Sequence, residues 1–243
     1  MSTPIKIKCT ISSIDAHSDL VFTVKLKPSR RVPRFKPGQF LHLALDSYDP
    51  TGGYWPESRV FSIASAPFES EITIAYAVKG KFTLRMKKEL EAGRDVWVKL
   101  PYGYFVISSA PEEEVVLVAG GTGITPFIPF LQKGINNSSG EKISLVYGVR
   151  RPELLVFGDV IEDALANLNG FSLYAFCEER TNSVFQFPMK HGSLTMDAIL
   201  QTITDPIKTN FYLSGPVEMI KTFKNGLKDT GINDTHIHVD EWE

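Results

Sequence analysis

The chain has 243 residues, of which 43% are hydrophobic and 22% charged, with a formal net charge of −2 and a pI of about 6.2. This length suits two domains of ordinary size, and the near-neutral charge argues against nucleic acid or anionic membranes as partners. No apolar run reaches the length of a membrane span, and Met1–Lys8 alternates apolar and charged residues. We therefore expect neither a membrane span nor a signal peptide, and we place the protein in the cytoplasm.

Metal and disulfide chemistry finds little support in the sequence. Cys9 and Cys177 are the two cysteines, far apart in the chain, so a cluster held by four thiolates is excluded within it and a disulfide scaffold is implausible. Both thiols are expected to be buried. His236 and His238 would share one face of a strand, but no third ligand is close in sequence. We expect no metal site.

The first hundred residues have the composition of short strands divided by Pro and Gly. Strict apolar alternation is clearest in 72–78, and one helix is expected at 83–90. This spacing predicts a closed or nearly closed antiparallel barrel that forms a first domain, 1–109. The expected strands are Ile5 to Ile14, Leu20 to Leu26, Gln39 to Leu45, Arg59 to Ser65, Ile72 to Val78 and Asp95 to Leu100.

From Val115 onward strands and helices alternate, which predicts a parallel sheet covered on both faces in a second domain, 110–243. The fold class is therefore a two-domain chain, an antiparallel β-barrel followed by an α/β nucleotide-binding domain. The connection at 108–113 is polar and short, so the domains are expected to pack together. The expected strands are 115–118, 143–147, 171–176, 211–213 and 236–239, with helices from 125, near 160–168, near 194–203 and from 217.

A glycine-rich turn organises the second half. Val115–Val118 is a continuous apolar strand, and Gly120, Gly121 and Gly123 follow it. Pro126 occupies the expected first turn of a helix. A strand, a turn without side chains and a helix N-terminus form an anion site, most suitably for a pyrophosphate. A ligand-free tight turn is the alternative, and a P-loop fits poorly because no Gly-Lys-Ser/Thr follows.

Two stretches of the first half have candidate ligand groups. Arg59 offers a charged planar fork for phosphate, alternation puts Phe61 on the same face, and Ser62 adds a hydroxyl. An ordinary strand with a rim arginine is the alternative. Gly80 leads into the predicted helix, where Thr83 is an N-cap by default and part of a second pyrophosphate site by hypothesis.

Taken together, these motifs resemble the ferredoxin–NADP⁺ reductase superfamily along essentially the whole chain. The resemblance implies a flavin-binding barrel followed by a pyridine-nucleotide domain. The motifs occur in the order Arg59-Val-Phe-Ser62, Gly80-Lys-Phe-Thr83, Pro101-Tyr-Gly-Tyr-Phe105, Gly120-Gly-Thr-Gly-Ile-Thr-Pro126, Tyr147-Gly-Val-Arg150 and Tyr212-Leu-Ser-Gly-Pro216.

The resemblance also implies roles for single residues. Arg59 would bind the FAD pyrophosphate, Phe61 would lie against the isoalloxazine or its chain, and Ser62 would lie near flavin N5. The rest of the FAD site would comprise Tyr76, Gly80, Lys81, Phe82 and Thr83. The nicotinamide dinucleotide would be held by Gly121, Thr122, Gly123, Pro126, Arg150, Arg180, Ser214, Gly215 and Pro216. Many members have Cys-Gly-Pro where this chain has Ser214, so a thiol-specific contribution is absent here.

The C-terminus resembles the acidic-x-aromatic ending of several members. Trp242 would cover one flavin face until the nicotinamide displaces it, and Asp240 would lie near the hydride path, so both join Ser62 as candidate catalytic residues. A frayed tail is the alternative. Glu241 competes with Asp240 for the acidic role.

The resulting prediction is an FAD-dependent NAD(P)H oxidoreductase that passes electrons to a separate acceptor: a ferredoxin or flavodoxin, a partner subunit, or a small molecule. A reductase that uses free flavin as substrate and a non-catalytic subunit that keeps the fold are the alternatives. Glu178 and Glu179 follow the strand expected to meet the adenosine ribose and favour NADH. Arg150 and Arg180 would favour NADPH if either reaches a 2′-phosphate.

Overall fold

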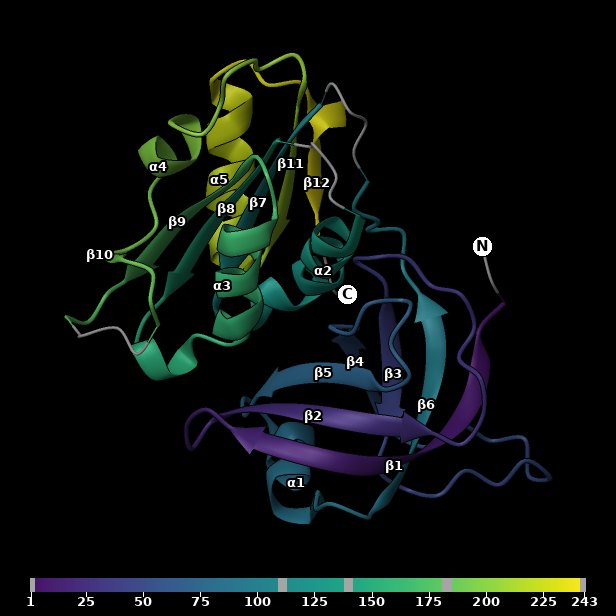
Figure 1. Cartoon of the computed structure of the whole chain (residues 1–243). Coiled ribbons are helices and arrows are strands. Elements are labelled where there is room, and N and C mark those ends of the chain that lie inside the picture. Colours follow the sequence, from purple (N-terminus) through teal and green to yellow (C-terminus); the bar gives the residue numbers. More distant parts are fainter. Residues whose placement is uncertain (1–2, 109–112, 138–141, 181–184, 241–243) are drawn as a thin grey trace. The chain divides into compact units, whose positions relative to one another are not determined.

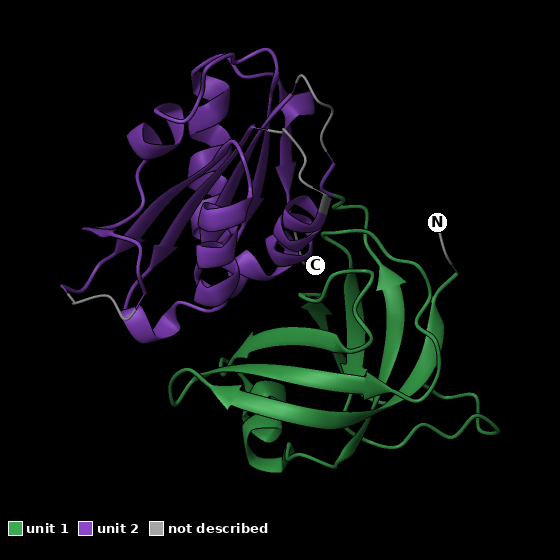
Figure 2. Ribbon diagram, viewed as in Figure 1, with its two compact units in different colours: residues 1–106 green, residues 107–243 purple. Residues whose placement is uncertain are grey.

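The computed structural model describes residues 3–108, 113–137, 142–180 and 185–240. The chain divides into two compact units, residues 1–106 and 107–243 (Figure 2). Each unit has one sheet, and the strands and helices are labelled in Figure 1. Among the described helices, none has both the length and the apolar character needed to cross a bilayer.

Unit 1 is a nearly closed six-stranded antiparallel barrel, as predicted. Its sheet has the order β4-β3-β6-β1-β2-β5. After β4 the chain continues along β5: the Ala64 amide donates to the Thr73 carbonyl (2.8 Å), and the Thr73 amide donates to Oγ of Ser65 (3.1 Å). These bonds join the two edge strands, which hides their backbone groups. The strands are β1 (Ile5–Ala16), β2 (Val21–Pro28), β3 (Phe40–Ala44), β4 (Ser58–Ser62), β5 (Ile72–Ala77) and β6 (Asp95–Tyr102).

Alternate residues of each strand fill the barrel. Ile7, Cys9 and Ile11 of β1 point inward and are at most 1% exposed. Helix α1 (Lys81–Glu89) adds Phe82 and Met86 to the same core. Burying one such aliphatic or aromatic side chain contributes about 1.5–3 kcal/mol. Burial also raises the pKa of the Cys9 thiol to about 12, so this cysteine acts as a small apolar residue, as expected.

The predicted start of α1 was wrong by two residues. Gly80 is the N-cap and Lys81 the first helical residue, so Thr83 lies inside the first turn rather than at the cap. Its Oγ1 accepts hydrogen bonds from the amides of Lys79 (2.9 Å) and Gly80 (3.1 Å). The hydroxyl therefore reaches back to satisfy amides before the helix, the reciprocal half of a capping box. Sequence spacing alone does not distinguish this position from the cap.

Unit 2 is a six-stranded parallel sheet with helices on both faces. The strand order is β10-β9-β8-β7-β11-β12. Helices α2 (Ile128–Asn137) and α3 (Gly158–Asn167) cover one face, and α5 (Val217–Asp229) covers the other (Figure 1). A short α4 (Met196–Leu200) precedes β11. The strands are β7 (Glu114–Gly120), β8 (Lys142–Val149), β9 (Phe171–Cys177), β10 (Met189–His191), β11 (Thr209–Ser214) and β12 (Ile237–Val239).

Apolar periodicity fixes how α5 packs. Ile220, Phe223 and Leu227 recur at helical spacing and are buried against Phe211 and Leu213 of β11. All seven residues of β7 are buried, which matches the prediction of a strand covered on both faces. The edge strand β10 was not predicted, because Met-Lys-His has no strand-like pattern.

The helix after the glycine-rich turn begins later than predicted. A 3₁₀ turn spans Gly121–Phe127, and α2 starts at Ile128, so Pro126 lies inside the 3₁₀ turn rather than in the first α-helical turn. Oγ1 of Thr125 donates to the Thr122 carbonyl (2.6 Å), and the Ile128 amide bonds to Thr125. The tighter turn satisfies the backbone with local bonds and needs no amide from proline.

A buried carboxylate forms hydrogen bonds that connect several segments at the amino-terminal edge of this sheet. Glu114 accepts hydrogen bonds from Nζ of Lys142 (3.0 Å), the Thr204 amide (3.0 Å) and Oγ1 of Thr209 (3.4 Å). Burial alone would raise the pKa of the Glu114 carboxyl, but the bonds from Thr204 and Lys142 and the charge of Lys142 outweigh it. They lower that pKa to about 2. The ionised form is therefore part of the folded state.

This carboxyl makes stability depend on pH between about 4.5 and 2. The pKa of this carboxyl in the folded protein lies below its ordinary value of 4.5, so its contribution to stability is complete above that value and disappears as the pH falls toward 2. The full contribution is about 3 kcal/mol. We expect Glu114→Gln to lower the free energy of unfolding by about that amount at pH 7, with a gap that closes toward pH 2. Urea unfolding of both proteins across this range tests it, and a gap independent of pH would contradict it.

Candidate functional site

The order in which the chain adds strands to the sheet changes direction between the parallel neighbours β7 and β11. From β7 the chain crosses through α2 to β8, whereas from β11 it crosses through α5 on the opposite face to β12. Neighbouring strands whose crossovers leave on opposite faces open a crevice at their carboxyl ends. The glycine-rich turn after β7 and the Ser214-Gly215 turn after β11 lie at this point.

A different physical reason accounts for the glycine at each position of the first turn. A Cβ on Gly123 would run into the backbone carbonyl of Ser214, and one on Gly120 would lie 2.6 Å from Sδ of Met219. Gly121 has φ +55° and nothing within 4 Å of its Cβ position. Packing therefore requires glycine at 120 and 123, while residue 121 keeps open space beside a left-handed turn, where a ligand can approach the backbone. Met219 was missed by sequence reasoning because its helical spacing marks it only as apolar.

Two predicted site residues from different segments meet at this crevice. Oγ of Ser214 donates to Oδ2 of Asp240 (2.9 Å), and the Asp240 amide donates to the Leu213 carbonyl (2.9 Å). Ser214 and Asp240 are only 2% and 5% exposed. A buried carboxylate needs such bonds, so the hydroxyl at 214 orients the acidic side chain. Trp242 and Glu241 lie outside the described residues.

The same sheet edge continues to the carboxyl ends of β8 and β9. The amides of Glu178 and Glu179 donate to the carbonyls of Val149 (3.1 Å) and Arg150 (3.0 Å). Oγ of Ser193 donates to Oε1 of Glu178 (3.1 Å). Both glutamates, Arg150 and Arg180 are exposed. Acidic and basic groups therefore share this edge, as predicted, and Ser193 joins them without any signal in the sequence.

In the barrel, Arg59 lies beside the start of α1. Its guanidinium is 5.3 Å above the Phe82 ring, and Nη2 pairs with Oε1 of Glu57 at 3.0 Å. The Arg59 side chain is 53% exposed. Nothing lies within 4 Å of a Cβ built on Gly80, the helix N-cap. The structure thus brings an exposed cationic fork and a helix N-terminus together from segments about twenty residues apart in sequence, an arrangement suited to phosphate.

The aromatic candidates of the barrel lie deeper than expected. Phe61 shares the inward face of β4 with Arg59, but its ring is 8% exposed and meets Tyr76 edge-on at 6.4 Å. Tyr76 is 3% exposed, and burial raises the pKa of its hydroxyl to about 12. Both rings are core residues in this structure, with little surface for a ligand. Ser62 is half-buried on the outer face of β4.

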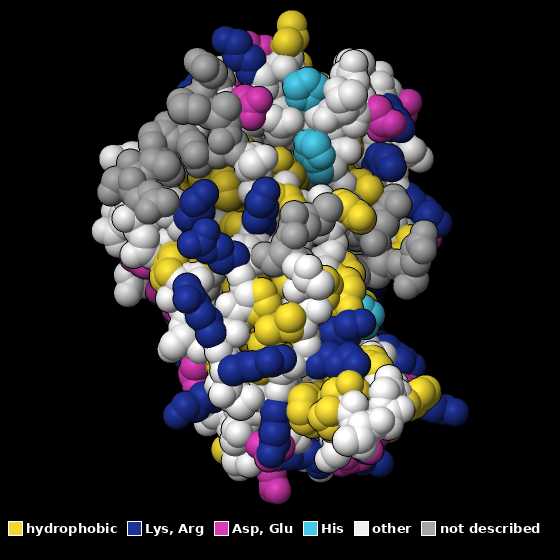
Figure 3. Space-filling model, turned by 90° about the vertical axis from the view of Figure 1, so that its right-hand side faces the viewer, with side chains coloured by type: hydrophobic (Ala, Val, Ile, Leu, Met, Phe, Trp, Pro, Cys, Tyr) yellow, Lys and Arg dark blue, Asp and Glu magenta, His cyan; other side chains and the backbone are white. Residues whose placement is uncertain are grey.

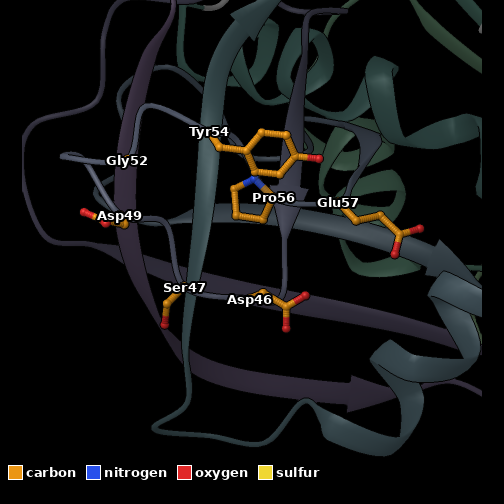
Figure 4. Close-up of a pocket in the computed structure, with 7 residues that line it drawn as sticks. All are labelled: Asp46, Ser47, Asp49, Gly52, Tyr54, Pro56 and Glu57. Atoms are coloured by element: carbon orange, nitrogen blue, oxygen red, sulfur yellow. The ribbon is translucent and has the colours of Figure 1, made fainter.

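An open pocket on the barrel has the wrong charge for a phosphate. Figure 4 shows carboxylates around it. Asp46 is held by Arg85 through two bonds of 2.8 and 2.5 Å. Like charges would repel a pyrophosphate here. The lining residues are Asp46, Ser47, Asp49, Gly52, Tyr54, Pro56 and Glu57. The described residues also contain no group of His, Cys, Asp or Glu side chains arranged to hold a metal ion.

Comparison with known proteins agrees with this geometry. Residues 117–225, which run from β7 into α5, match the family model of the oxidoreductase NAD-binding domain. A ferredoxin NADP⁺ reductase from Neisseria gonorrhoeae, solved with FAD and NADP, superposes with a TM-score of 0.75 over 99% of both chains at 20% identity. The chain therefore shares the fold of this reductase. An Amycolatopsis cytochrome P450 reductase superposes with a TM-score of 0.80 over 98% of this chain and 70% of its own, also at 20% identity.

The curated relatives that the chain matches are longer proteins. The glycine betaine monooxygenase reductase subunit of Chromohalobacter salexigens is 25% identical over 84% of this chain and 55% of its own length. The 2-halobenzoate 1,2-dioxygenase electron transfer component of Burkholderia cepacia is 26% identical over 93% of this chain and 63% of its own. The chain therefore spans little more than half of the relatives it matches.

Proposed function

We propose that the chain is an FAD-dependent NAD(P)H oxidoreductase that passes electrons to a separate acceptor. The observation that carries the proposal is the crevice at β7 and β11, with its open left-handed Gly121 and its buried Ser214–Asp240 pair, inside a segment that matches the NAD-binding family. Residues 110–243 would bind the dinucleotide and residues 1–109 the flavin. The names of the two oxygenase-related reductases support electron transfer to a separate protein.

The carboxyl edge of the sheet offers a path for an extended dinucleotide. Glu178, Arg150 and Arg180 would meet the adenosine end at β9 and β8, and Gly121 to Gly123 would meet the pyrophosphate after β7. The Ser214-Gly-Pro216 turn would meet the nicotinamide at β11. Three strand spacings separate β9 from β11, about 14 Å. This distance suits a nucleotide pair joined by a pyrophosphate.

The barrel fits the phosphates of FAD better than its ring. Arg59 would hold the pyrophosphate at the start of α1, with exposed Lys81 and the first amides of the helix around it. The Ser62 hydroxyl would donate toward the flavin nitrogen. Phe61, Tyr76 and Phe82 would support the site mainly from the core, since each is at most 8% exposed.

Bound FAD would supply the chemistry, accepting a hydride from nicotinamide and releasing electrons singly or in pairs. The chain would bind and orient both cofactors and exclude water. Asp240, oriented by Ser214, would place a carboxylate beside the nicotinamide, and Trp242 would cover the flavin until the nicotinamide arrives. A ferredoxin, a flavodoxin, a partner subunit or a small molecule would take the electrons, and we retain a cytoplasmic location as part of the proposal.

An absorption spectrum of the purified protein, followed by titration with NADH and NADPH, tests this function. We expect a bound flavin that bleaches when reduced nicotinamide is added. A colourless protein that oxidises NADH only with added flavin would make flavin a substrate. A protein that neither binds flavin nor oxidises NAD(P)H would reject the proposal in favour of a non-catalytic subunit.

Coenzyme preference follows from the charges at the ends of β8 and β9. Two exposed carboxylates, Glu178 and Glu179, would repel a 2′-phosphate and accept ribose hydroxyls, so we expect NADH to be preferred. Arg180→Ala should then leave kcat/KM for NADH nearly unchanged, and Ser193→Ala, which frees Glu178, serves as the matched variant. A tenfold or greater preference for NADPH that Arg180→Ala abolishes would show that the arginine decides instead.

A further inference from the structure

The acidic pocket on the barrel adjoins the candidate phosphate site. Glu57 lines the pocket and pairs through Oε1 with Nη2 of Arg59 at 3.0 Å, and the Arg59 guanidinium lies above Phe82 at the start of α1. Asp46 also lines the pocket and is held by Arg85, one turn further along the same helix. A phosphate bound at Arg59 would therefore lie next to the pocket, with α1 fixing both.

The loop that lines this pocket, residues 45–57 between β3 and β4, is anchored to the barrel by aromatic rings. Nε1 of Trp55 donates to Oγ of Ser58 (3.0 Å), and the Trp55 ring lies 5.6 Å from the ring of Tyr48. Tyr48 in turn meets Trp97 of β6 edge-on, with 5.3 Å between ring centres. A loop that is already held in place loses little conformational freedom when a ligand binds.

Next to the anchored Trp55, the loop leaves one aromatic ring in solvent. Tyr54 lines the pocket and is 80% exposed, compared with 60% for Phe68 and 45% for Leu20 elsewhere on the barrel. Some of the exposed hydrophobic side chains of this unit are yellow in the lower part of Figure 3. Figure 4 shows the Tyr54 ring beside the ring of Pro56. An open aromatic face on a fixed backbone is suited to stacking against a flat heterocycle.

The polar groups of the pocket indicate what a flat ligand must carry. Asp46, Asp49 and Glu57 contribute carboxylates, which accept hydrogen bonds and donate none. They repel a phosphate but suit hydroxyl and amino groups, which a ribose and an adenine supply. The pocket has a volume of about 430 Å³, within the usual range of small-molecule sites, about 300–1,000 Å³. A nucleoside attached to a phosphate at Arg59 matches the size, the aromatic face and the charge.

We propose that this pocket binds the adenosine half of FAD, with the adenine ring stacked on Tyr54 and the ribose hydroxyls donating to the carboxylates. This inference rests on the proposed function, in which Arg59 binds the FAD pyrophosphate. FMN ends at its phosphate and has no group that could enter the pocket. Tyr54 is therefore a specificity-determining residue, through which the chain selects FAD over FMN.

Fluorescence titration of the full-length apoprotein with FAD and with FMN tests the pocket. FMN reports binding of the flavin ring and its phosphate alone, so it detects general damage to the flavin site. Tyr54→Ala removes the stacking ring, and Tyr54→Phe keeps the ring without its hydroxyl. Phe68→Ala is the matched control, because it removes an exposed aromatic ring of the barrel that does not line the pocket.

We expect the parent to bind FAD at least about tenfold more tightly than FMN, and Tyr54→Ala to lose about tenfold in FAD affinity while its FMN affinity stays within about twofold. Tyr54→Phe and Phe68→Ala should match the parent with both flavins. The proposal would be overturned by equal affinity of the parent for FAD and FMN, by unchanged FAD affinity in Tyr54→Ala, or by a loss in that variant that is the same for both flavins. A loss of FAD affinity in Tyr54→Phe or Phe68→Ala as large as in Tyr54→Ala would also overturn it. A parent that binds neither flavin would instead reject the proposed function.

Discussion

Gly123→Ala is expected to destabilise unit 2 by about 3 kcal/mol and to weaken dinucleotide binding at least about tenfold. The new methyl group would meet the backbone carbonyl of Ser214, which a side-chain rotation cannot relieve. The turn after β7 and the turn after β11 would have to separate. Because these turns form the two walls of the crevice, stability and binding should fall together. Urea unfolding and titration with NADH measure the two effects.

Gly121→Ala provides the matched control. It adds the same methyl group two residues earlier, where nothing lies within 4 Å, but at φ +55°. Its cost should therefore be the conformational one alone, about 1–2 kcal/mol. If the variants at 121 and 123 were equally stable, close packing against Ser214 would not explain the glycine at 123. If Gly121→Ala lost NADH binding and Gly123→Ala did not, the open space beside the turn at Gly121 would be the place where the ligand approaches.

Much of the architecture could be predicted because each element has a local signature. The buried run at 115–118, the glycine turn and the helical spacing of Ile220, Phe223 and Leu227 depend on neighbours in sequence. Element starts were less certain, as Thr83 and Pro126 show, because capping hydroxyls and 3₁₀ bonds shift a helix by two or three residues. Strand β10 gave no signal at all.

The candidate site was harder to predict than the fold because its key contacts are nonlocal. The bond from Ser214 to Asp240 joins residues 26 positions apart and exists only because β12 pairs with β11. Alternation correctly put Arg59 and Phe61 on one face of the strand, but it does not predict how deeply each side chain is buried. Arg59 is at the rim while Phe61 is in the core. Their difference comes from the curvature of a closed barrel, which a period of two residues does not encode.

Arg59→Ala is expected to weaken FAD binding about ten- to hundredfold, since it removes a charge-assisted phosphate contact of about 1.5–3 kcal/mol. Arg59→Lys keeps the charge but loses the planar fork, so it should recover only part of the affinity. In this structure the guanidinium pairs with Glu57 at 3.0 Å, and a phosphate would have to compete with that carboxylate.

Glu57→Gln therefore separates a binding role of Arg59 from a structural one. If Arg59 binds the pyrophosphate, removing the competing charge should leave FAD affinity equal to the parent's or higher, whereas a structural pair would be weakened by either substitution. Fluorescence titration of apoprotein with FAD measures all three variants, and unfolding curves show whether the barrel is intact. Equal affinity in Arg59→Ala and the parent would remove Arg59 from the flavin site. If Glu57→Gln lost as much FAD affinity as Arg59→Ala, the ion pair would support the barrel instead. The arginine, whose side chain is 53% exposed, would then affect FAD affinity through its pair with Glu57 and not by contacting the ligand.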